Sequence, residues 1–299
     1  MISRIIYLTL LVIFSLSCTK SIEDERLEKD NATIEKYLNS RNLKFTKQNG
    51  VYHVIRNKGY GYRVAQGDSI SFWYVGYTFG TGGLVFDTNI LEVALEISLD
   101  TSVLSLLPVV TVAGDNELIE GLRRGLLICR EKEIATLLFS SIYGFGNQKV
   151  GPIPSWSPLA YDILLISVNN CQIRVEQENI STFVSQNEGF VQDTLGFWIK
   201  FLNESYTDLK PSIGDTIYGW YRASVLNGDV FAETPEVGQQ IIIGDDELTE
   251  GLTFGFMLMS PNQNAELVVP SSMGYGVNGY GAVAPYTPIF YEIRLDSIK

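Results

Sequence analysis

The chain has 299 residues, a formal net charge of −12 at pH 7 and a hydrophobic content of 45%. This length suits two ordinary domains after a leader segment, and the apolar content is enough for two cores. The acidic surplus argues against nucleic acid as a partner and against electrostatic adhesion to an anionic membrane. Because the chain has one histidine, His53, and three cysteines, a His-rich metal site and a Ser-His-Asp triad are not expected. We therefore expect neither a metal nor a cofactor.

The first residues have the layout of a secretory signal. Arg4 supplies a positive charge, and residues 5–16 form an uncharged run that is too short to span a bilayer as a helix. Cys18 directly follows a small residue, which resembles the lipidation site of bacterial lipoproteins. We expect residues 1–18 to be a lipoprotein signal peptide and Cys18 to anchor the chain to a membrane; a plain signal peptide is the alternative. The expected location is the bacterial cell envelope, at the outer membrane on its periplasmic or surface side.

Residues 19–44 are expected to form a tether and a short helix. The stretch 19–30 is rich in charge and is predicted to be solvated. Ile34, Tyr37 and Leu38 then follow the i, i+3, i+4 spacing of one helix face. The same spacing returns 146 residues later, starting at Ile180.

After this helix the sequence repeats itself. The segment E-L-I-E-G-L-R-R-G-L starts at Glu117, and E-L-T-E-G-L-T-F-G-F starts at Glu247, an offset of 130 residues. A repeat of this length indicates a duplicated domain, because solenoid units are far shorter. We place the first domain at 45–170 and the second at 171–299, which includes its own opening helix.

Each half is predicted to consist of strands and one short helix. Gly-Asp turns at Gly67 and Gly214 lead into β-branched and aromatic runs, which strands prefer. The repeated E-L segment is predicted as a short helix, ended by Gly125 in the first half. A strand follows at 134–139, and in the last strand Tyr161, Ile163 and Leu165 occupy alternate positions, as a strand with one buried face requires. The fold class is therefore α+β, with an antiparallel sheet wrapped around a short helix.

Two further features are not explained by the repeat. An apolar insertion at 91–110 lengthens one loop of this half only, and its side chains need burial or a partner. Cys129 and Cys171 are compatible with a disulfide in an oxidising compartment, but spacing alone cannot show whether they pair.

At about 66–168 and 213–299 the sequence resembles the FKBP-type peptidyl-prolyl isomerases. The landmarks are a G-D start, a Tyr in the next strand, F-D after a glycine turn, a helix written I-x-G-[WL]-x-x-G, a [PS]-S-x-x-[AG]-[YF]-G loop and a proline-containing turn before the last strand. Their order is kept twice. The resemblance implies two FKBP-like domains and a peptidyl-prolyl cis-trans isomerase acting on proline-containing polypeptides.

In that family an aromatic pocket lies between the sheet and the helix. The resemblance implies the following catalytic residues in the first domain: Tyr74, Phe86, Asp87, Phe145 and Tyr161. It implies substrate-binding residues at Val109, Leu118, Ile119, Leu122 and Ile153. In the second domain the corresponding set is Tyr221, Phe231, Leu248, Thr249, Leu252, Tyr275 and Tyr291.

Each half departs from the family pattern. The Trp that usually forms the pocket floor is Leu122 in the first half and a leucine again in the second. The loop Tyr whose hydroxyl usually meets the substrate carbonyl is Phe145 in the first half, whereas the second keeps Tyr275. The acidic residue after the strand Phe is Asp87 in the first half and Ala232 in the second. The first domain is the better candidate enzyme because it keeps Phe and Asp together.

Three hypotheses remain open from the sequence. The first is an envelope prolyl isomerase that assists folding of exported proteins. The second is a catalytically degenerate lipoprotein acting as a chaperone or assembly module, which the missing Trp and the apolar insertion favour. The third is glycan binding through exposed aromatics, which is less well supported because most aromatics occupy predicted strand positions.

Overall fold

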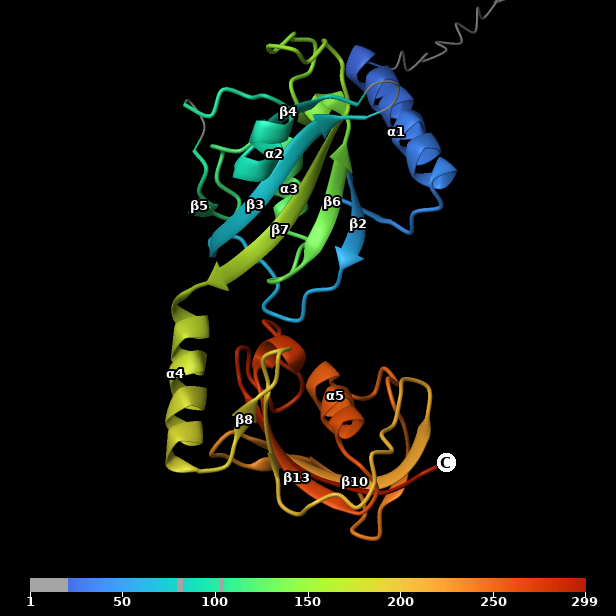
Figure 1. The fold of residues 1–299 in the computed structure, drawn as a ribbon, viewed down its shortest axis with the longest axis vertical. Helices are drawn as coiled ribbons and strands as arrows, with labels where there is room; N and C mark the ends of the chain where they lie inside the picture. The colour runs from blue at the N-terminus through green and yellow to red at the C-terminus, as the bar shows by residue number, and fades with distance from the viewer. Residues whose placement is uncertain (1–20, 80–82, 103–104) are drawn as a thin grey trace, which may run out of the picture.

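The computed structural model describes residues 21–79, 83–102 and 105–299. Two antiparallel sheets follow one another along the chain and form two domains arranged along the long axis of the molecule (Figure 1). This α+β architecture confirms the predicted fold class. The predicted signal peptide and Cys18 lie outside the described residues. Among the residues that are described, no helix combines the length and apolar character needed to cross a membrane.

The first domain contains one seven-stranded sheet with the order β1-β2-β6-β7-β3-β4, in which β5 also pairs with β3. Neighbouring strands are antiparallel throughout. The elements of this domain are α1 (Ile22–Ser40), β1 (Thr46–Gln48), β2 (Val51–Asn57), β3 (Ser69–Thr78), β4 (Val85–Thr88), α2 (Leu91–Glu96), β5 (Val109–Val112), α3 (Glu120–Leu126), β6 (Ile134–Phe139), the 3-10 turn η1 (Ser141–Tyr143) and β7 (Leu159–Asn169).

The second domain repeats this order strand for strand, as β8-β9-β13-β14-β10-β11 with β12 paired to β10. Its elements are α4 (Cys171–Gln186), β8 (Val191–Gln192), β9 (Trp198–Phe201), β10 (Thr216–Val225), β11 (Val230–Glu233), β12 (Gln239–Ile242), α5 (Glu250–Leu258), β13 (Gln263–Val269), the 3-10 turn η2 (Ser271–Met273) and β14 (Ile289–Ile298). The helix α4 connects the two domains along one side of the molecule (Figure 1).

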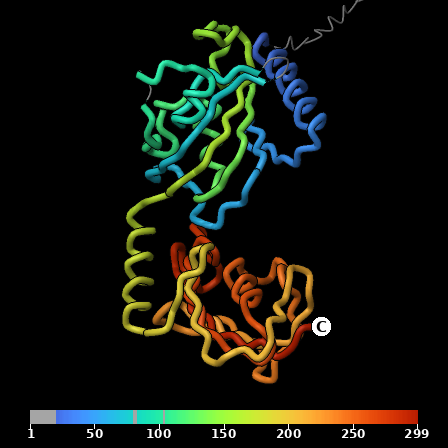
Figure 2. The backbone as a smooth tube through the Cα atoms, in the orientation of Figure 1, coloured from blue at the N-terminus to red at the C-terminus, as the bar shows by residue number. Residues whose placement is uncertain are grey.

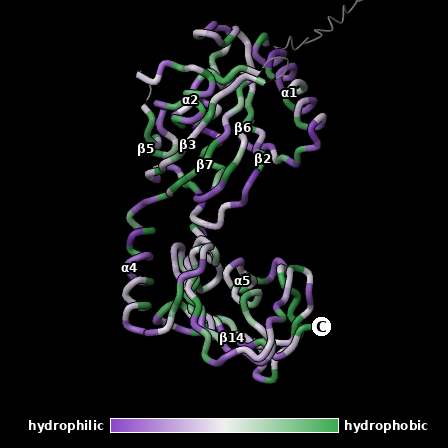
Figure 3. Tube along the Cα trace, in the orientation of Figure 1, coloured by the Kyte–Doolittle hydropathy of each residue, from purple (hydrophilic) through white to green (hydrophobic). Residues whose placement is uncertain are grey.

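The core of the first domain lies between one face of the sheet and α3. Alternate residues of β7, namely Tyr161, Ile163 and Leu165, are buried in this core, as expected for a strand with period-two side chains. Figure 3 shows hydrophobic stretches along β7 and its neighbouring strands. The predicted alternation from Tyr161 onward is therefore what places the core.

Two glycines let α3 approach the sheet closely. A Cβ on Gly121 would overlap the ring of Phe139, and one on Gly125 would lie 2.6 Å from Cδ1 of Leu137. Only a residue without a side chain fits at either position. The prediction that Gly125 ends the helix is wrong: α3 continues to Leu126, and Gly125 serves close packing instead.

The opposite face of the first sheet is covered by α1. Ile34 and Leu38 are fully buried there against Tyr52, Val54 and other outer-face residues. These two residues belong to the helix face that the spacing predicted. The helix α4 covers the equivalent face of the second sheet through Ile180 and its neighbours, and Figure 2 shows both helices lying beside their domains.

The prediction of a tether at 19–30 is wrong over the part that the structure describes, although most of these residues are exposed. A capping box at Ser21 starts the helix α1, so that Asp24 accepts from the backbone and hydroxyl of Ser21. This box satisfies backbone donors that would otherwise be unpaired at a helix start. The acidic residues of the first turn also suit the helix dipole. The charged sequence was therefore the start of a helix, which continues to Ser40.

The two domains contact one another through a buried arginine. Arg130 is 6% exposed and donates to Oε2 of Glu250 at 2.8 Å and to the carbonyl of Ser272 at 2.6 Å, both in the second domain. Lys58 donates to the other oxygen of Glu250 at 2.7 Å. Glu250 therefore opens α5 while it is held by two cations of the first domain.

The two remaining cysteines are unpaired. Cys129 is buried in the first domain, whereas Cys171 is exposed at the start of α4, and both are free thiols. The sequence left a disulfide between these two cysteines open, and the structure does not contain it.

Candidate active site

The first-domain pocket is formed by neighbouring strands, one helix and one loop. Tyr74 comes from β3, Phe86 and Asp87 come from β4, and Tyr161 comes from β7. Leu122 of α3 closes the pocket from the opposite side. Alternation along the strands and the pairing of Gly76 with both Asp87 and Tyr161 put Tyr74, Asp87 and Tyr161 on the face that meets α3. Phe86 is the extra residue at a register shift between β3 and β4, and it lines the pocket as well.

The pocket has a volume of about 380 Å³. Its lining includes all ten residues that the resemblance implied for this domain: Tyr74, Phe86, Asp87, Val109, Leu118, Ile119, Leu122, Phe145, Ile153 and Tyr161. It also includes five that the sequence reasoning missed: Phe72, Glu117, Val150, Gly151 and Pro152. Phe72 stands two residues before Tyr74 on one strand, so the alternation contained the signal that would have found it.

Aromatic rings form the walls. The ring of Phe86 stands edge-on to Tyr161, with centroids 5.9 Å apart, and edge-on to Phe145 at 6.3 Å. Phe139 also stacks on Tyr161, with ring centroids 5.9 Å apart. Such edge-to-face contacts add to the stability gained from burial. They give the site an apolar wall of packed rings.

One polar pair faces this apolar surface. The hydroxyl of Tyr74 donates to Oδ2 of Asp87 at 2.8 Å. Burial, together with the charge and hydrogen bond of Asp87, raises the pKa of Tyr74. The phenol therefore remains protonated and keeps donating to the carboxylate over the whole neutral range.

A buried asparagine that the sequence did not single out holds this region together. Asn89 is 2% exposed; its Oδ1 accepts from the backbone N–H of Tyr74 at 2.8 Å. Its amide donates to the carbonyls of Phe72 at 3.2 Å and Leu107 at 2.9 Å. Asn89 thus fastens the insertion to the strand that carries Tyr74.

The loop that carries Phe145 is fixed by a carboxylate from α1. Asp30 is 1% exposed, and its Oδ2 accepts from the hydroxyl of Ser140 at 2.8 Å and from the backbone and hydroxyl of Ser141. Arg26 pairs with the other oxygen of Asp30 at 2.7 Å and donates to the carbonyl of Trp156. The expected tether therefore contains a residue that orients one wall of the pocket.

The second domain repeats this arrangement. Glu176 of α4 is 1% exposed and accepts from the backbone of Ser271 at 2.5 Å and from its hydroxyl at 2.7 Å. Glu176 follows Asp30 by 146 residues, and Ser271 follows Ser141 by 130. Burial raises the pKa of Glu176, although its hydrogen bonds oppose the rise. Sequence reasoning missed both carboxylates because neither lies in the segments that resemble the family.

The residues implied for the second domain are arranged differently. The hydroxyls of Thr249 and Tyr291 hydrogen-bond each other at 2.9 Å. Tyr275 stacks on Tyr280 at 5.1 Å, and Phe231 meets Tyr275 edge-on. Leu252 and Tyr291 are buried core residues, with Tyr221 and Leu248 packed against that core. Tyr221 and Leu248 also line a hollow of about 230 Å³ with residues of β12.

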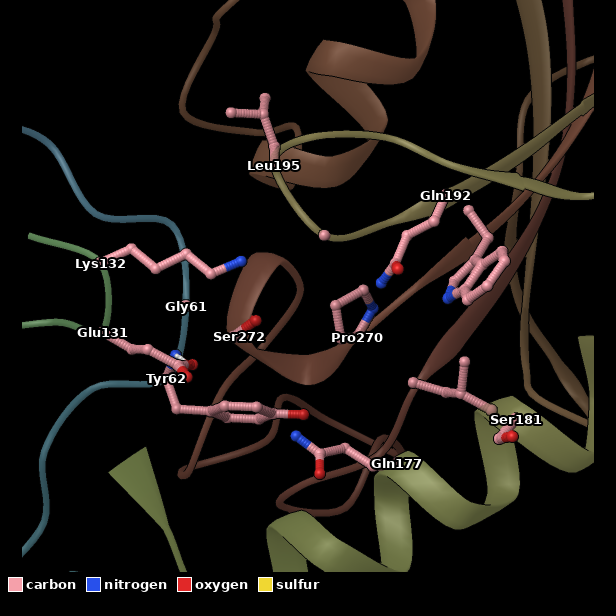
Figure 4. A pocket seen from close by; sticks show the side chains of 13 residues that line it. Gly61, Tyr62, Glu131, Lys132, Gln177, Ser181, Gln192, Leu195, Pro270 and Ser272 are labelled. Carbon is pink, nitrogen blue, oxygen red and sulfur yellow. Dashed lines mark hydrogen bonds between the residues drawn. The ribbon is translucent and has the colours of Figure 1, made fainter. Parts of the chain in front are cut away.

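A further hollow of about 260 Å³ lies between the domains (Figure 4). Tyr62 and Lys132 of the first domain face Gln177 of α4 and Pro270 of the second domain across it. Ser272, which Arg130 holds, also contributes to its lining. The loop that carries Tyr275 is thus in contact with the first domain, whereas the loop that carries Phe145 is held by α1.

A sheet folded over a short helix is present twice in the chain, and the first copy holds an aromatic pocket between the two. These features define a tandem of FKBP-type domains. The chain belongs to the FKBP-type peptidyl-prolyl cis-trans isomerase family, whose model matches residues 61–166 and 207–296. The two matched ranges cover more than half of the chain.

The chain is similar to known proteins over part of their length. The chain is 28% identical over 238 residues to peptidyl-prolyl cis-trans isomerase FKBP10 of Mus musculus, a match covering 78% of this chain and 35% of that protein. It is 27% identical over 121 residues to outer membrane protein MIP of Legionella longbeachae, covering 39% and 52%. The chain thus spans about a third of the length of the first of these relatives.

Among solved structures, the chain is similar to a peptidyl-prolyl cis-trans isomerase from Pseudomonas syringae pv. tomato. The sequence identity is 22% and the TM-score is 0.39, and the match covers 43% of this chain and 93% of that one.

Proposed function

We propose that this chain catalyses cis-trans isomerisation of X-Pro bonds in polypeptides and that the activity resides in the first domain. One observation carries the proposal: a pocket of about 380 Å³ brings together ten residues that the family resemblance implied. Its walls are aromatic, and the Tyr74–Asp87 pair supplies polar groups. We assign 45–170 and 171–299 as the two domains, in keeping with sheets that begin at Thr46 and at Val191.

The proposed mechanism needs no activated nucleophile. Rotation about an X-Pro bond meets a barrier of roughly 18–20 kcal/mol because the amide is conjugated. In the twisted transition state this conjugation is lost, so the carbonyl and nitrogen are less dipolar than in the planar amide. A pocket without water favours the less polar species and thereby lowers the barrier.

Each pocket residue then has a simple role. Phe86 and Tyr161 grip the proline ring from two sides, and Leu122 forms the floor. Tyr74 and Asp87 orient the backbone that flanks the proline. Phe145 contributes a wall but has no hydroxyl to offer the substrate carbonyl, so we expect a less efficient catalyst than a pocket with Tyr at this position.

We further propose that the protein acts in the bacterial cell envelope, held by a lipid on Cys18, and assists folding of exported proteins. The support is the signal-like sequence of residues 1–18 and the name of the Legionella longbeachae relative, which is an outer membrane protein. Labelling cells with a radioactive fatty acid tests the anchor: the wild-type chain is expected to take up label, and a Cys18→Ala chain is not.

The catalytic proposal is tested by the isomerisation rate of a short peptide with one X-Pro bond. Wild type is compared with Phe86→Ala in the first domain and with the matched change Phe231→Ala in the second. We expect the first change to lower kcat/KM at least tenfold and the second to leave it within twofold. Equal activity in all three would remove the assignment to the first domain.

A specific observation favours a second candidate function, the holding of unfolded polypeptide. The insertion forms a groove of about 450 Å³ on the outer face of the first sheet, where its lining is mostly apolar. The residues that line it are Trp73, Val75, Ile90, Leu91, Glu92, Leu106, Ile134, Asp162, Ile163 and Leu164. Nearby Leu95 and Leu107 are 60% and 70% exposed, so an extended apolar segment would gain burial there.

Aggregation assays separate this function from catalysis. The chain is mixed with a denatured client protein, and light scattering is followed for wild type, Leu91→Ser and Phe86→Ala. Holding by the groove predicts that only Leu91→Ser lets the client aggregate. If Phe86→Ala alone lets the client aggregate, clients bind in the aromatic pocket. If wild type does not prevent aggregation, or if neither substitution restores it, the second function is rejected.

A further inference from the structure

Three side chains that can bind a metal meet in the interior of the first domain. His53 comes from β2, Cys129 follows α3, and Glu133 precedes β6. They are 6%, 1% and 2% exposed. Nε2 of His53 lies 2.7 Å from Oε1 of Glu133, and the ligand atoms of all three lie within 4.8 Å of one another. None of the three lines the aromatic pocket.

The second domain shows that the fold does not require these residues. Cys129 and Glu133 correspond to Met259 and Gln263, 130 residues later. His53 corresponds to Ile199: His53 pairs with Leu137 across the sheet, and Ile199 pairs with Leu267, again 130 residues after Leu137. At this corner of the fold the second domain has an isoleucine, a methionine and a glutamine, whereas the first domain has an imidazole, a thiol and a carboxylate.

The chemistry of the three groups fits one metal class. Zn²⁺ is bound by imidazole nitrogen at about 2.0–2.1 Å, by thiolate sulfur at about 2.3 Å and by carboxylate oxygen at about 2.0–2.2 Å. Ligand atoms around such an ion are separated by roughly 3–4 Å, so the present spacing needs only small side-chain movements. A sulfur ligand disfavours Mg²⁺ and Ca²⁺, which take oxygen ligands.

The charges of the three side chains also suit a divalent ion. A divalent ion with one thiolate and one carboxylate is neutral, and a neutral assembly is the one that a buried site tolerates best. The thiol of Cys129, which donates to the carbonyl of Gly125 at 3.2 Å, would release its proton to solvent as the sulfur binds the ion. His53 would bind through Nε2, which now faces Glu133.

We propose that His53, Cys129 and Glu133 form a binding site for one zinc-like transition-metal ion, present in the first domain and lacking in the second. The sequence argument excluded sites rich in histidine but did not foresee a mixed site, because the three residues are far apart along the chain. The ion would join β2 to the corner between α3 and β6. It would thus secure the helix whose Leu122 forms the pocket floor.

The second domain supplies the test variant. The full chain is compared with a triple variant carrying His53→Ile, Cys129→Met and Glu133→Gln, and with the single change Cys129→Ser. Cys171→Ser, at the exposed thiol, is the control. Each is refolded with and without Zn²⁺, since a buried site fills most readily during folding. Native mass spectrometry counts bound ions, Co²⁺ is added to look for a thiolate charge-transfer band, and Tm is measured.

We expect one Zn²⁺ per chain, a Co²⁺–thiolate band, and a Tm that Zn²⁺ raises by about 5 °C or more, in wild type and in Cys171→Ser. The triple variant should fold, bind no ion and show no Tm shift. If the triple variant fails to fold, Cys129→Ser decides, because it too must lose the band and the ion. The proposal is overturned if wild type binds no stoichiometric Zn²⁺, or if binding survives in Cys129→Ser or disappears in Cys171→Ser.

Discussion

Asp30 of α1 and Ser141 of the pocket loop are joined by two hydrogen bonds: the backbone N–H and the hydroxyl of Ser141 both donate to Oδ2 of Asp30, at 2.9 and 2.6 Å. Four residues later this loop presents Phe145 to the proposed active site. A helix that precedes the family-like segment thus controls the geometry of one pocket wall. The same contact between Glu176 and Ser271 in the second domain indicates that it belongs to the repeated unit.

Removing this carboxylate should impair catalysis. Asp30→Ala leaves buried serine donors without an acceptor, which costs about 1–3 kcal/mol, and frees the loop. We expect kcat/KM for an X-Pro peptide to fall about tenfold, since a wall of the site is no longer fixed. Asp30→Glu should retain most activity, because Glu176 shows that a longer carboxylate reaches the backbone N–H and hydroxyl of the equivalent serine, Ser271.

Glu25→Gln, an exposed change on the same helix, is the control and should behave as wild type. Circular dichroism confirms that each variant is folded at the assay temperature. If Asp30→Ala keeps full activity while folded, the loop does not depend on this contact.

The Tyr74–Asp87 pair should act as a unit. Tyr74→Phe removes the donor of a hydrogen bond to a carboxylate, and Asp87→Asn keeps an acceptor oxygen but removes its charge; about 1.5–3 kcal/mol is typical for a hydrogen bond to a charged group. We expect each single change to lower kcat/KM at least fivefold and the double change to cost less than the sum of both. A double-mutant cycle measures this coupling, and strict additivity would show that the two side chains act separately.

A hydroxyl at position 145 should improve the enzyme. Phe145→Tyr introduces a donor at the edge of the pocket, where the resemblance implies a contact with the substrate carbonyl. One added hydrogen bond of about 1 kcal/mol corresponds to roughly a fivefold gain in kcat/KM. The second domain keeps Tyr275 at this position and serves as the natural precedent. An unchanged or lower rate would indicate that the substrate carbonyl lies elsewhere.

The domain junction should weaken in acid. Burial alone would raise the pKa of Glu250, but hydrogen bonds and charges from Lys58 and Arg130 hold it below the ordinary value of 4.5. A carboxyl with a lowered folded pKa adds stability above its unfolded pKa, and this stability disappears as the pH falls through the folded pKa. Glu250→Gln should thus be less stable than wild type at pH 7, by about 1–2 kcal/mol, and this difference should shrink as the pH falls below 4.5.

Urea unfolding at pH 7, 5 and 3 measures this difference. Glu247→Gln, whose side chain is exposed on the approach to the same helix, is the matched control. A gap between Glu250→Gln and wild type that stays constant with pH would contradict the electrostatic account.

Much of the fold could be predicted because strand alternation and the repeated motifs can both be recognised in short stretches of sequence. The alternation from Tyr161 and the segment 134–139 identify strands that the structure contains, and the doubled E-L-x-E-G-L motif locates both short helices. Gly125 was misread because a glycine near a helix end is more often a stop than a packing site. Only the nearby side chain of Leu137 shows which role applies.

The residues that line the pocket could be predicted from the motifs, but the residues that hold this lining in place could not. Asp30 and Asn89 act through contacts with residues far away in the chain, and a lone acidic or amide residue carries no pattern that reports such a contact. The charge run at 19–30 was read as solvated because its composition resembles a linker. A helix with one buried carboxylate has almost the same composition.

The most direct test of the central claim is NMR exchange spectroscopy of a peptide with one X-Pro bond in the presence of the chain. Without a catalyst the cis and trans forms interconvert in tens to hundreds of seconds, so their signals show no exchange on the sub-second scale. We predict exchange cross-peaks with the wild-type chain and their loss with Phe86→Ala. If the folded wild-type chain produces no exchange, or if Phe86→Ala produces as much, the first-domain pocket is not a prolyl isomerase site.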